Sequence, residues 1–440
     1  MPNNHSRRDF LRKSTALAGG LALSSQIAAK AHAGGTDDVI KIGLIGCGGR
    51  GTGAAVQALS TSQNVRLVAM ADAFRDRLDK SHKGIKGQLE DNELDAGRLA
   101  VDEAHKFVGF DAYKKLIPLV DVLLIATPPG FRPIHFEAAV NADKHVFMEK
   151  PLAVDGPGVR RVLKAAEMAK KKQLNVVVGL QRHYQKKYTD GWVDMLQNGA
   201  IGDLTTAYVY WNSGGVWVRP RQEEQTEMEY QMRNWYYFNW LCGDHINEQH
   251  IHNLDVGNWV FQDYPVEASG YGGRHMRNGK EHGEIFDHHF VEYTYADGRK
   301  MISQCRHWKG CANKVSEAFT GTNGSAPAPG KIMTRSGYAL LNHNDRKDPN
   351  PYQYEHDVLF KAIANGEYKF ADAENGAKST LTAILGRMAT YSGQIVNWDD
   401  ALNSELDLSP QTYAFDAAPP IQPLASGFYP VPVPGETKVK

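Results

Sequence analysis

The stretch that decides the fold runs from Val39 to Gly51 and reads VIKIGLIGCGGRG. Its first half is a compact, β-branched apolar run typical of a buried strand, and a helix is predicted to follow over 52–59. Between them the glycines follow the spacing GxGxxG, which permits a tight turn, close backbone approach to a pyrophosphate and close packing of the helix on the strand. The free N–H groups at the helix start then point at the phosphates. We therefore expect a dinucleotide site that includes Gly46, Gly48, Gly49, Arg50 and Gly51.

A carboxylate stands where such a site needs one. A second predicted strand, over 65–71, ends at Asp72, about 20 residues beyond Gly51, which is where a dinucleotide fold places its ribose-binding acid. An acid there favours NAD because it repels the 2′-phosphate of NADP. Arg75 and Arg77 follow closely and could reverse that preference, so NADP stays the alternative cofactor. The competing interpretation is a plain glycine turn followed by a surface aspartate.

The strand–helix alternation continues along the chain. Residues 119–126 form a near-continuous apolar run, as in a parallel sheet covered on both faces, and a helix is predicted over 133–142. Ligands of open α/β sheets bind beyond the carboxyl ends of the strands. Thr127, Pro128 and His135 are therefore predicted to line the cofactor, although His135 could equally be a packing residue.

The next predicted strand, over 145–148, leads directly into Glu149-Lys150-Pro151. A lysine beside a glutamate, held at a strand end by a proline, is a candidate for chemistry. A helix over 158–172 and a strand over 174–178 follow, and the chain then reaches Gln181. Six strands with intervening helices would complete a doubly wound α/β domain over 38–180, with Glu149, Lys150 and Gln181 near the cofactor.

The pattern changes in the second half, assigned to 181–416. Runs rich in Val, Tyr and Thr over 204–212, 267–272, 288–295 and 300–307 predict strands, and Ala296-Asp297-Gly298 is a hairpin turn signal. We expect a largely antiparallel open sheet, hence an α+β second domain. Its uncovered face would suit a homo-oligomer interface.

The densest polar segment spans 243–255. On one continuous helix Asp244, Glu248, His252 and Asp255 would share a face, with Glu248 one turn before His252. A carboxylate so placed can orient a histidine and tune its proton affinity for acid–base catalysis. Asp255 is a candidate for substrate contact or for bracing the helix.

A metal site is the alternative for this segment, with His245, Glu248, His250 and His252 as ligands. His250 and His252 would point to different sides of a helix, and none of the tight zinc spacings is matched. We therefore expect no metal.

An aromatic run over 230–240 precedes this segment. Aromatic rings with Arg and Asn donors suit sugars, which present apolar C–H faces and hydroxyl edges. Arg233, Trp235 and Tyr236 are thus candidate substrate residues, and Tyr188 is a further one. A core-packing aromatic loop explains the same run.

Composition narrows the remaining possibilities. Lys and Arg (50) balance Asp and Glu (50), so neither nucleic acid nor an anionic membrane is expected as a partner.

Twin arginines at Arg7 and Arg8, a weakly apolar stretch and Ala31-His32-Ala33 predict a twin-arginine signal peptide over 1–33 and a periplasmic location. Cys305 and Cys311 are near enough in sequence to pair, but their spacing decides nothing. The proline-rich residues 417–440 predict an extended arm that could embrace a neighbouring subunit.

The glycine turn, Ala126-Thr127-Pro128 and Glu149-Lys150-Pro151, in this order, resemble the Gfo/Idh/MocA family of glucose-fructose oxidoreductase and inositol dehydrogenase. The resemblance covers nearly all of the chain after the predicted signal peptide. It implies C-terminal helices that pack back on the first domain, and an acid, a histidine and a second acid at Glu248, His252 and Asp255. Two departures concern the substrate pocket: the first acid is Glu rather than Asp, and His250 replaces a common glycine.

These features together favour an NAD(P)-dependent oxidoreductase that moves hydride between a secondary hydroxyl of a sugar, glycoside or polyol and a tightly bound nicotinamide. We expect His252 to act as the base and Lys150 as its hydrogen-bonding and electrostatic partner. The main alternative is redox-neutral glycoside cleavage through a transient keto sugar, which resembles NAD-dependent glycosidases of this fold. A non-catalytic sugar-binding protein is the minor one.

Overall fold

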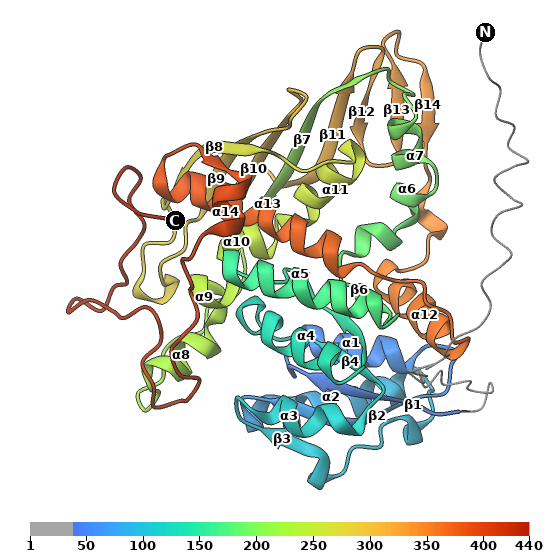
Figure 1. Cartoon of the computed structure of the whole chain (residues 1–440), viewed down its shortest axis with the longest axis vertical. Helices are drawn as coiled ribbons and strands as arrows, with labels where there is room; N and C mark the ends of the chain where they lie inside the picture. The colour runs from blue at the N-terminus through green and yellow to red at the C-terminus, as the bar shows by residue number, and fades with distance from the viewer. Residues whose placement is uncertain (1–37, 440) are drawn as a thin grey trace, which may run out of the picture. The chain divides into compact units, whose positions relative to one another are not determined.

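A six-stranded parallel sheet carries the glycine turn in a computed structural model that describes residues 38–439 (Figure 1). Its strand order, β3-β2-β1-β4-β5-β6, is that of a doubly wound dinucleotide fold. The strands are β1 (Ile40–Ile45), β2 (Val65–Asp72), β3 (Lys106–Val108), β4 (Val122–Ile125), β5 (His145–Met148) and β6 (Val176–Val178). The predicted signal peptide lies outside the described residues.

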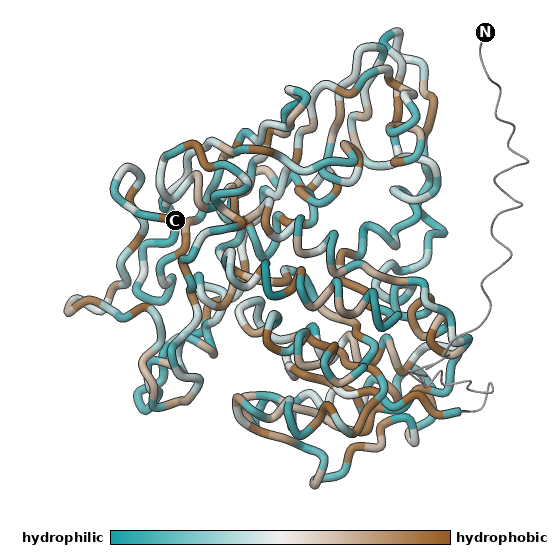
Figure 2. The backbone as a smooth tube through the Cα atoms, viewed as in Figure 1, coloured by the Kyte–Doolittle hydropathy of each residue, from teal (hydrophilic) through white to brown (hydrophobic). Residues whose placement is uncertain are grey.

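Helices cover both faces of this sheet, and the side-chain period of two explains why its strands are apolar throughout. Ile45, Leu123 and Ile125 pack into one hydrophobic cluster, whereas Leu44 and Leu124 pack into another on the opposite face. Figure 2 shows the hydrophobic backbone segments along β1 and β2. The helices of this part are α1 (Gly49–Leu59), α2 (Arg75–Asp91), α3 (Ala112–Leu116), α4 (Arg132–Asn141) and α5 (Gly156–Lys171).

The second half contains a nine-stranded sheet in the order β14-β13-β12-β11-β7-β10-β9-β8-β15. Its pairs are antiparallel except β7 with β10, which run parallel. The strands are β7 (Leu204–Ser213), β8 (Glu267–Gly273), β9 (His288–Thr294), β10 (Lys300–His307), β11 (Lys314–Gly321), β12 (Gly324–Ala328), β13 (Lys331–Thr334), β14 (Ala339–Asn342) and β15 (Val396–Asn397). The predicted fold class, α/β followed by a largely antiparallel α+β part, is confirmed.

One strand of this sheet contains a proline. Residues 321–330 are rich in glycine and proline, which is typical of a loop, yet they contain β12, which pairs with β11 and β13. The pairing register shifts between Ser325 and Ala328, and this irregularity accommodates Pro327.

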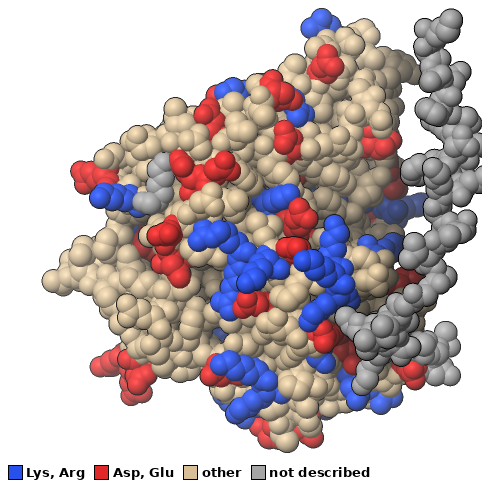
Figure 3. All heavy atoms as spheres, viewed as in Figure 1, with Lys and Arg blue, Asp and Glu red and all other residues tan. Residues whose placement is uncertain are grey.

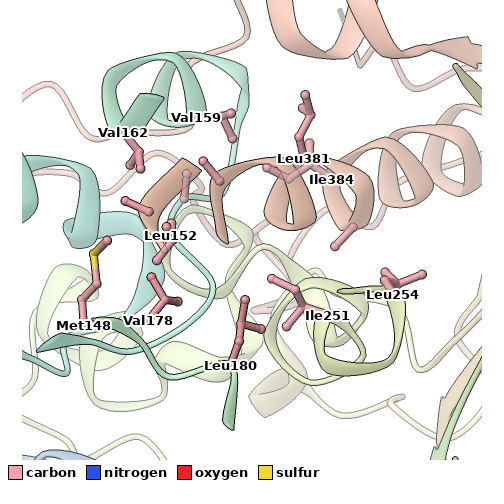
Figure 4. Packing of buried hydrophobic residues seen from close by; sticks show 14 of the residues in the cluster. Met148, Leu152, Val159, Val162, Val178, Leu180, Ile251, Leu254, Leu381 and Ile384 are labelled. Atoms are coloured by element: carbon pink, nitrogen blue, oxygen red, sulfur yellow. The ribbon is translucent and has the colours of Figure 1, made fainter. Parts of the chain in front are cut away.

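The two halves share one hydrophobic core. The long helix α13 (Ala373–Ser392) packs against α5 on one side and α11 (Ile251–Phe261) on the other. Figure 4 shows side chains of β5, β6, α5, α11 and α13 meeting there, among them Met148, Val162 and Ile384. The helix α12 (Pro351–Ala364) packs against α1. The C-terminal helices α12 and α13 thus pack against helices of the first domain.

The segment 243–255 is two helices and not the single helix predicted. The first, α10 (Asp244–Glu248), ends one residue before Gln249, and α11 begins at Ile251. The amides of Gln249 and His250 both donate to the carbonyl of His245, at 3.0 and 3.2 Å, which widens the turn. The imidazole of His250 reaches the sheet through Ser303 Oγ at 2.8 Å, and this contact places the break.

Residues 413–439, which include the predicted arm and are called the C-terminal arm below, pack on their own chain; contact with a neighbouring subunit stays a prediction. Gln231 Nε2 donates to the carbonyl of Ile421 at 2.8 Å, and Thr226 Oγ1 to that of Phe415 at 2.6 Å. Remaining short helices are α6 (Lys186–Thr189), α7 (Trp192–Gln197), α8 (Glu227–Arg233), α9 (Asn239–Cys242) and α14 (Trp398–Asn403).

The surface agrees with the balanced composition. Basic and acidic side chains are interspersed on the face shown in Figure 3. No helix within residues 38–439 has the length and apolar character needed to cross a membrane. Cys305, which is buried, and Cys311, which is exposed, are both free thiols.

Candidate active site

A cavity of about 500 Å³ opens at the carboxyl ends of the parallel strands, where the strand order reverses between β1 and β4. This is where doubly wound sheets bind their ligands, and the volume is in the range of small-molecule sites. Eight of the predicted cofactor residues line it: Gly46, Gly48, Gly49, Arg50, Asp72, Thr127, Pro128 and His135.

The glycine turn has the geometry that a dinucleotide requires. Gly46 has φ +95°, which favours glycine, and a Cβ on Gly51 would lie 2.0 Å from the carbonyl oxygen of Gly46. Gly48 and Gly49 line the cavity, and a Cβ on either would meet no atom within 4 Å. The backbone there is bare toward the cavity at the start of α1, which suits a pyrophosphate.

Asp72 holds the turn and faces the cavity. Its two carboxylate oxygens accept hydrogen bonds from the amides of Cys47 at 2.6 Å and Phe74 at 2.9 Å. Burial raises the pKa of this carboxyl above its ordinary value, and the two amides oppose that rise. The residues present therefore fit a nicotinamide dinucleotide, with Asp72 on the ribose side of the glycine turn.

Four predicted cofactor residues do not line the cavity: Gly51, Glu149, Lys150 and Gln181. Gly51 acts through helix packing. Glu149 turns to Arg50, whose Nε donates to it at 2.5 Å, and a Cβ on Gly179 would lie 2.8 Å from its carboxylate. Gln181 is only partly buried, but its Oε1 is buried without a partner. Glu149 thus pairs with Arg50, and a different acid pairs with Lys150.

That acid is Glu248. The Lys150 ammonium lies 3.3 Å from Glu248 Oε1 and also donates to the Glu248 backbone carbonyl, so β5 and α10 meet at these two side chains. Burial raises the pKa of Glu248, whereas the positive charges of Lys150 and Arg132 lower it. These residues are far apart in the sequence, and the fold brings them together.

His252 sits on the next helix, 7% exposed, with its ring stacked on Trp211 at 6.0 Å. Its Nδ1 is buried and has no hydrogen-bond partner. Burial holds the pKa of His252 well below its ordinary value, and the charges of Lys150 and Arg182 lower it further. A neutral imidazole with an unused ring nitrogen can accept a proton.

Sequence reasoning missed Arg132. Its guanidinium is buried and donates to the carbonyls of Thr127 and Pro151, so it ties the ends of β4 and β5 together. Burial lowers the pKa of Arg132 to about 10, although Glu248 and Glu149 raise it. The charge of Arg132 also helps burial to lower the pKa of His135 to about 3, so His135 is neutral. An arginine at the start of a helix after a strand end was the available signal.

Two predicted substrate residues lie in the interior. Tyr188 donates to Glu317 at 2.9 Å and is 3% exposed. Asp255 accepts from His183 at 2.7 Å and from Ser379 and Asn375. Because their polar groups are satisfied inside the protein, Tyr188 and Asp255 brace the interior, which is the second role considered for Asp255, and their contact with substrate stays a prediction.

The aromatic run divides between two places. Arg233, the last residue of α8, and Trp235, in the turn after it, line the cofactor cavity. Their contact with substrate stays a prediction. Tyr236 is buried, and its hydroxyl has no partner. Burial raises the pKa of Tyr236, and the charge of Glu248 adds to the rise.

The metal ligands considered from the sequence do not converge. Among residues 38–439 the group with suitable spacing is Asp244, His245 and His289. Both Asp244 oxygens already accept hydrogen bonds, for example from Tyr391 at 2.6 Å and His245 at 2.8 Å. The buried guanidinium of Arg277 lies 3.5 Å from His245 Nδ1 and opposes a cation there.

Comparison with known proteins agrees with this geometry. Residues 40–180 match the family model described as "Oxidoreductase family, NAD-binding Rossmann fold" (GFO_IDH_MocA). The chain is 30% identical over 370 residues to an inositol 2-dehydrogenase of Pseudomonas savastanoi pv. phaseolicola, covering 81% of this chain and 96% of that protein.

Two solved structures share the fold. An aldose-aldose oxidoreductase from Caulobacter crescentus, complexed with glycerol, superposes with a TM-score of 0.62 at 17% identity, covering 82% of this chain and 100% of that one. A scyllo-inositol dehydrogenase from Lactobacillus casei, with bound NAD(H) and scyllo-inositol, gives 0.61 at 19% identity, with the same coverage.

Proposed function

The chain belongs to the Gfo/Idh/MocA family of NAD-binding oxidoreductases, and we propose that it oxidises a secondary hydroxyl of a sugar or polyol at the Lys150–Glu248–His252 centre. The observation that carries the proposal is a neutral, buried histidine with an unpartnered ring nitrogen beside a lysine–glutamate pair. The relatives named inositol 2-dehydrogenase support a polyhydroxylated substrate.

The chemistry follows from the protonation states. The substrate carbon loses a hydride and its hydroxyl loses a proton, which leaves a carbonyl. The nicotinamide, when bound, supplies the hydride acceptor. His252 takes the hydroxyl proton because its lowered pKa keeps it neutral. Lys150 donates a hydrogen bond to the same oxygen and stabilises the charge that develops on it.

Glu248 fixes the lysine for this task. By pairing with Nζ from α10 it holds the lysine side chain at the end of β5. In this position the lysine serves as the electrostatic partner and not as the base. This division of labour assigns proton transfer to His252 and charge stabilisation to Lys150.

Location and assembly belong to the same proposal. We propose export by the twin-arginine route to the periplasm, on the grounds of residues 6–12 and 31–33. Free NAD is scarce there, so we propose that the cofactor stays bound through successive turnovers and that the carbonyl group of a second sugar takes the hydride back after each oxidation. The face of the nine-stranded sheet directed away from α11 and α13 is the proposed homo-oligomer contact.

The experiment is to purify the full chain, release any bound nucleotide and identify it, and then expose the loaded protein to a panel of polyols and sugars. The proposal predicts reduction of bound cofactor and formation of a keto product. Release of free sugar from a glycoside, with no net change in the cofactor, would support redox-neutral cleavage instead. If neither occurs, and Lys150→Ala and His252→Ala bind ligand like the wild type, the protein is a sugar-binding protein without this activity.

A further inference from the structure

The second half of the chain builds one wall of the cofactor cavity. The parallel sheet contributes its strand ends and the loops after β2 and β3, including Phe74 and Phe110. The opposite wall comes from the loop after β7, the end of α8 and the turn that follows it, through Trp217, Arg219, Met232, Arg233 and Trp235. Trp217 and Trp235 meet edge to face at 5.9 Å, and Arg219 stacks over Trp217 at 5.0 Å.

One ion pair joins the two walls. Both terminal nitrogens of Arg233 donate to the carboxylate of Asp76, at 3.2 and 3.1 Å, so the pair is bidentate. The same guanidinium lies 4.0 Å from the centre of the Phe74 ring and is held from behind by Glu229. Asp76 belongs to the first turn of α2, just after Asp72, so this contact closes the ribose end of the cavity.

The pair stands between the cavity and a second, outer one of about 640 Å³. Arg77, Arg219 and Arg233 line both. A nucleotide leaving by its adenosine end through the outer cavity must pass these three arginines.

The C-terminal arm supports this wall from outside. The ring of Phe415 lies 5.2 Å from that of Phe74 and 4.9 Å from that of Phe110, and the ring of Tyr413 lies 5.5 Å from that of Phe131. Hydrogen bonds from Thr226 and Gln231 to the arm's carbonyls anchor it to α8. The arm thus contacts both the dinucleotide domain and the segment that faces it.

We propose that Trp217, Arg233 and Trp235 form a clasp over the adenosine half of the nicotinamide dinucleotide, latched by Asp76 and braced by the arm, and that the clasp sets the release rate of the cofactor. Aromatic faces and guanidinium groups suit an adenine ring and a ribose phosphate. The inference rests on the proposed function, because it assigns to named residues the retention of cofactor assumed there.

The test measures release and not turnover. Cofactor-loaded full-length protein is mixed with an excess of etheno-NAD, and exchange is followed by fluorescence. Loss of one ion pair and one cation–π contact corresponds to about a tenfold change in rate, so Arg233→Ala is expected to release cofactor about tenfold faster. Phe415→Ala, which leaves the ion pair in place, is expected to change the rate in the same direction.

Arg299→Ala is the matched control. Arg299 also pairs with an aspartate, Asp297, at 2.6 Å and stacks over Phe261 at 4.4 Å, with a side chain 20% exposed against 24% for Arg233, but it lines neither cavity. Its release rate should equal that of the wild type. Wild-type release from both Arg233→Ala and Phe415→Ala would overturn the clasp. If release responds as predicted while no sugar or polyol reduces the bound cofactor, the clasp stands and the proposed function fails.

Discussion

Two sets of an acid and a histidine meet around α11, and their contacts differ. Asp255 and His183 pair with each other: the acid accepts three side-chain hydrogen bonds, and the histidine stacks on Trp259 at 4.1 Å. Glu248 pairs with a lysine instead, and a buried nitrogen of His252 has no hydrogen-bond partner. In the proposed function this difference in hydrogen-bond satisfaction separates the catalytic set from the structural one, although each set consists of a carboxylic acid and a histidine.

The pKa shifts express this contrast. Burial lowers the pKa of both histidines, but the carboxylate of Asp255 outweighs it and raises the pKa of His183. His252 has only positive neighbours, Lys150 and Arg182, and its pKa stays depressed. The pKa of His183 is thus raised by its carboxylate partner, whereas the depressed pKa of His252 keeps it neutral and able to accept a proton.

Removing each histidine gives the largest predicted difference. His252→Ala should lower the rate of cofactor reduction by about 10²- to 10⁴-fold, because the general base is lost, and should leave cofactor binding intact. The matched variant His183→Ala should keep the wild-type rate constant. Single-turnover reduction of bound cofactor measures both, and equal losses in the two variants would erase the distinction.

Lys150→Met tests the catalytic role that we propose for the charge of Lys150 beside His252. Loss of its charge should slow cofactor reduction by about 10²-fold, the size expected for one electrostatic donor. It should also raise the pKa of His252, so the residual activity should lose its acid-side plateau at a higher pH than in the wild type. A pH profile that does not move would mean that the lysine acts elsewhere.

Asp255→Asn tests the structural role of the Asp255 carboxylate. It removes a buried charge that accepts from His183, Ser379 and Asn375, so the free energy of unfolding should fall by about 2 kcal/mol. Denaturant titration measures this loss, and the rate of cofactor reduction in the folded fraction should be unchanged. Glu248→Gln should instead lower the rate of cofactor reduction and leave the free energy of unfolding nearly unchanged. If both variants lose rate and stability alike, the distinction between the two acids fails.

The smallest predicted effect is on the pH dependence of the free energy of unfolding, to which His183 and His252 contribute with opposite signs. His183, with its raised pKa, contributes stability that is complete below its unfolded pKa of 6.5 and is lost as pH rises through its folded pKa. His252, with its lowered pKa, contributes stability that is present above 6.5 and is lost as pH falls toward its folded pKa.

Replacing each by alanine should therefore change the pH dependence of the unfolding free energy in opposite directions, by about 1 kcal/mol each. Calorimetry from pH 5 to 8 (about the usual range of maximal stability) would reveal it. If the curves of unfolding free energy against pH are displaced in the same direction for both alanine variants, the opposite pKa shifts of His183 and His252 are contradicted.

Much of this was predictable from local patterns. The glycine spacing, the apolar strands and the turn at Glu149-Lys150-Pro151 are short-range signals, and the strands and helices they predicted are present. The pairing of Lys150 with Glu248 was not predicted, because the two residues lie in different halves of the chain and no local pattern joins them.

The rest depended on tertiary contacts. Helix periodicity put Glu248 and His252 on one face, but the His250–Ser303 contact breaks that helix, a feature no spacing reveals. That Arg233 and Trp235 line the cavity at the glycine turn could not be predicted, because aromatic composition does not say which pocket a loop faces. The role of Asp255 depended on Ser379 and Asn375, which arrive on α13 from far along the chain.

The most direct test of the central claim is the pH dependence of hydride transfer in single turnovers of cofactor-loaded wild-type protein with a reactive polyol or sugar. If His252 is the neutral base, the rate constant stays level from neutral pH down past 6.5, the ordinary histidine pKa, and falls only below it, and His252→Ala loses this acid limb. A rate constant that instead climbs steadily above neutral pH, with the same profile in His252→Ala, would contradict the account and make Lys150 the base.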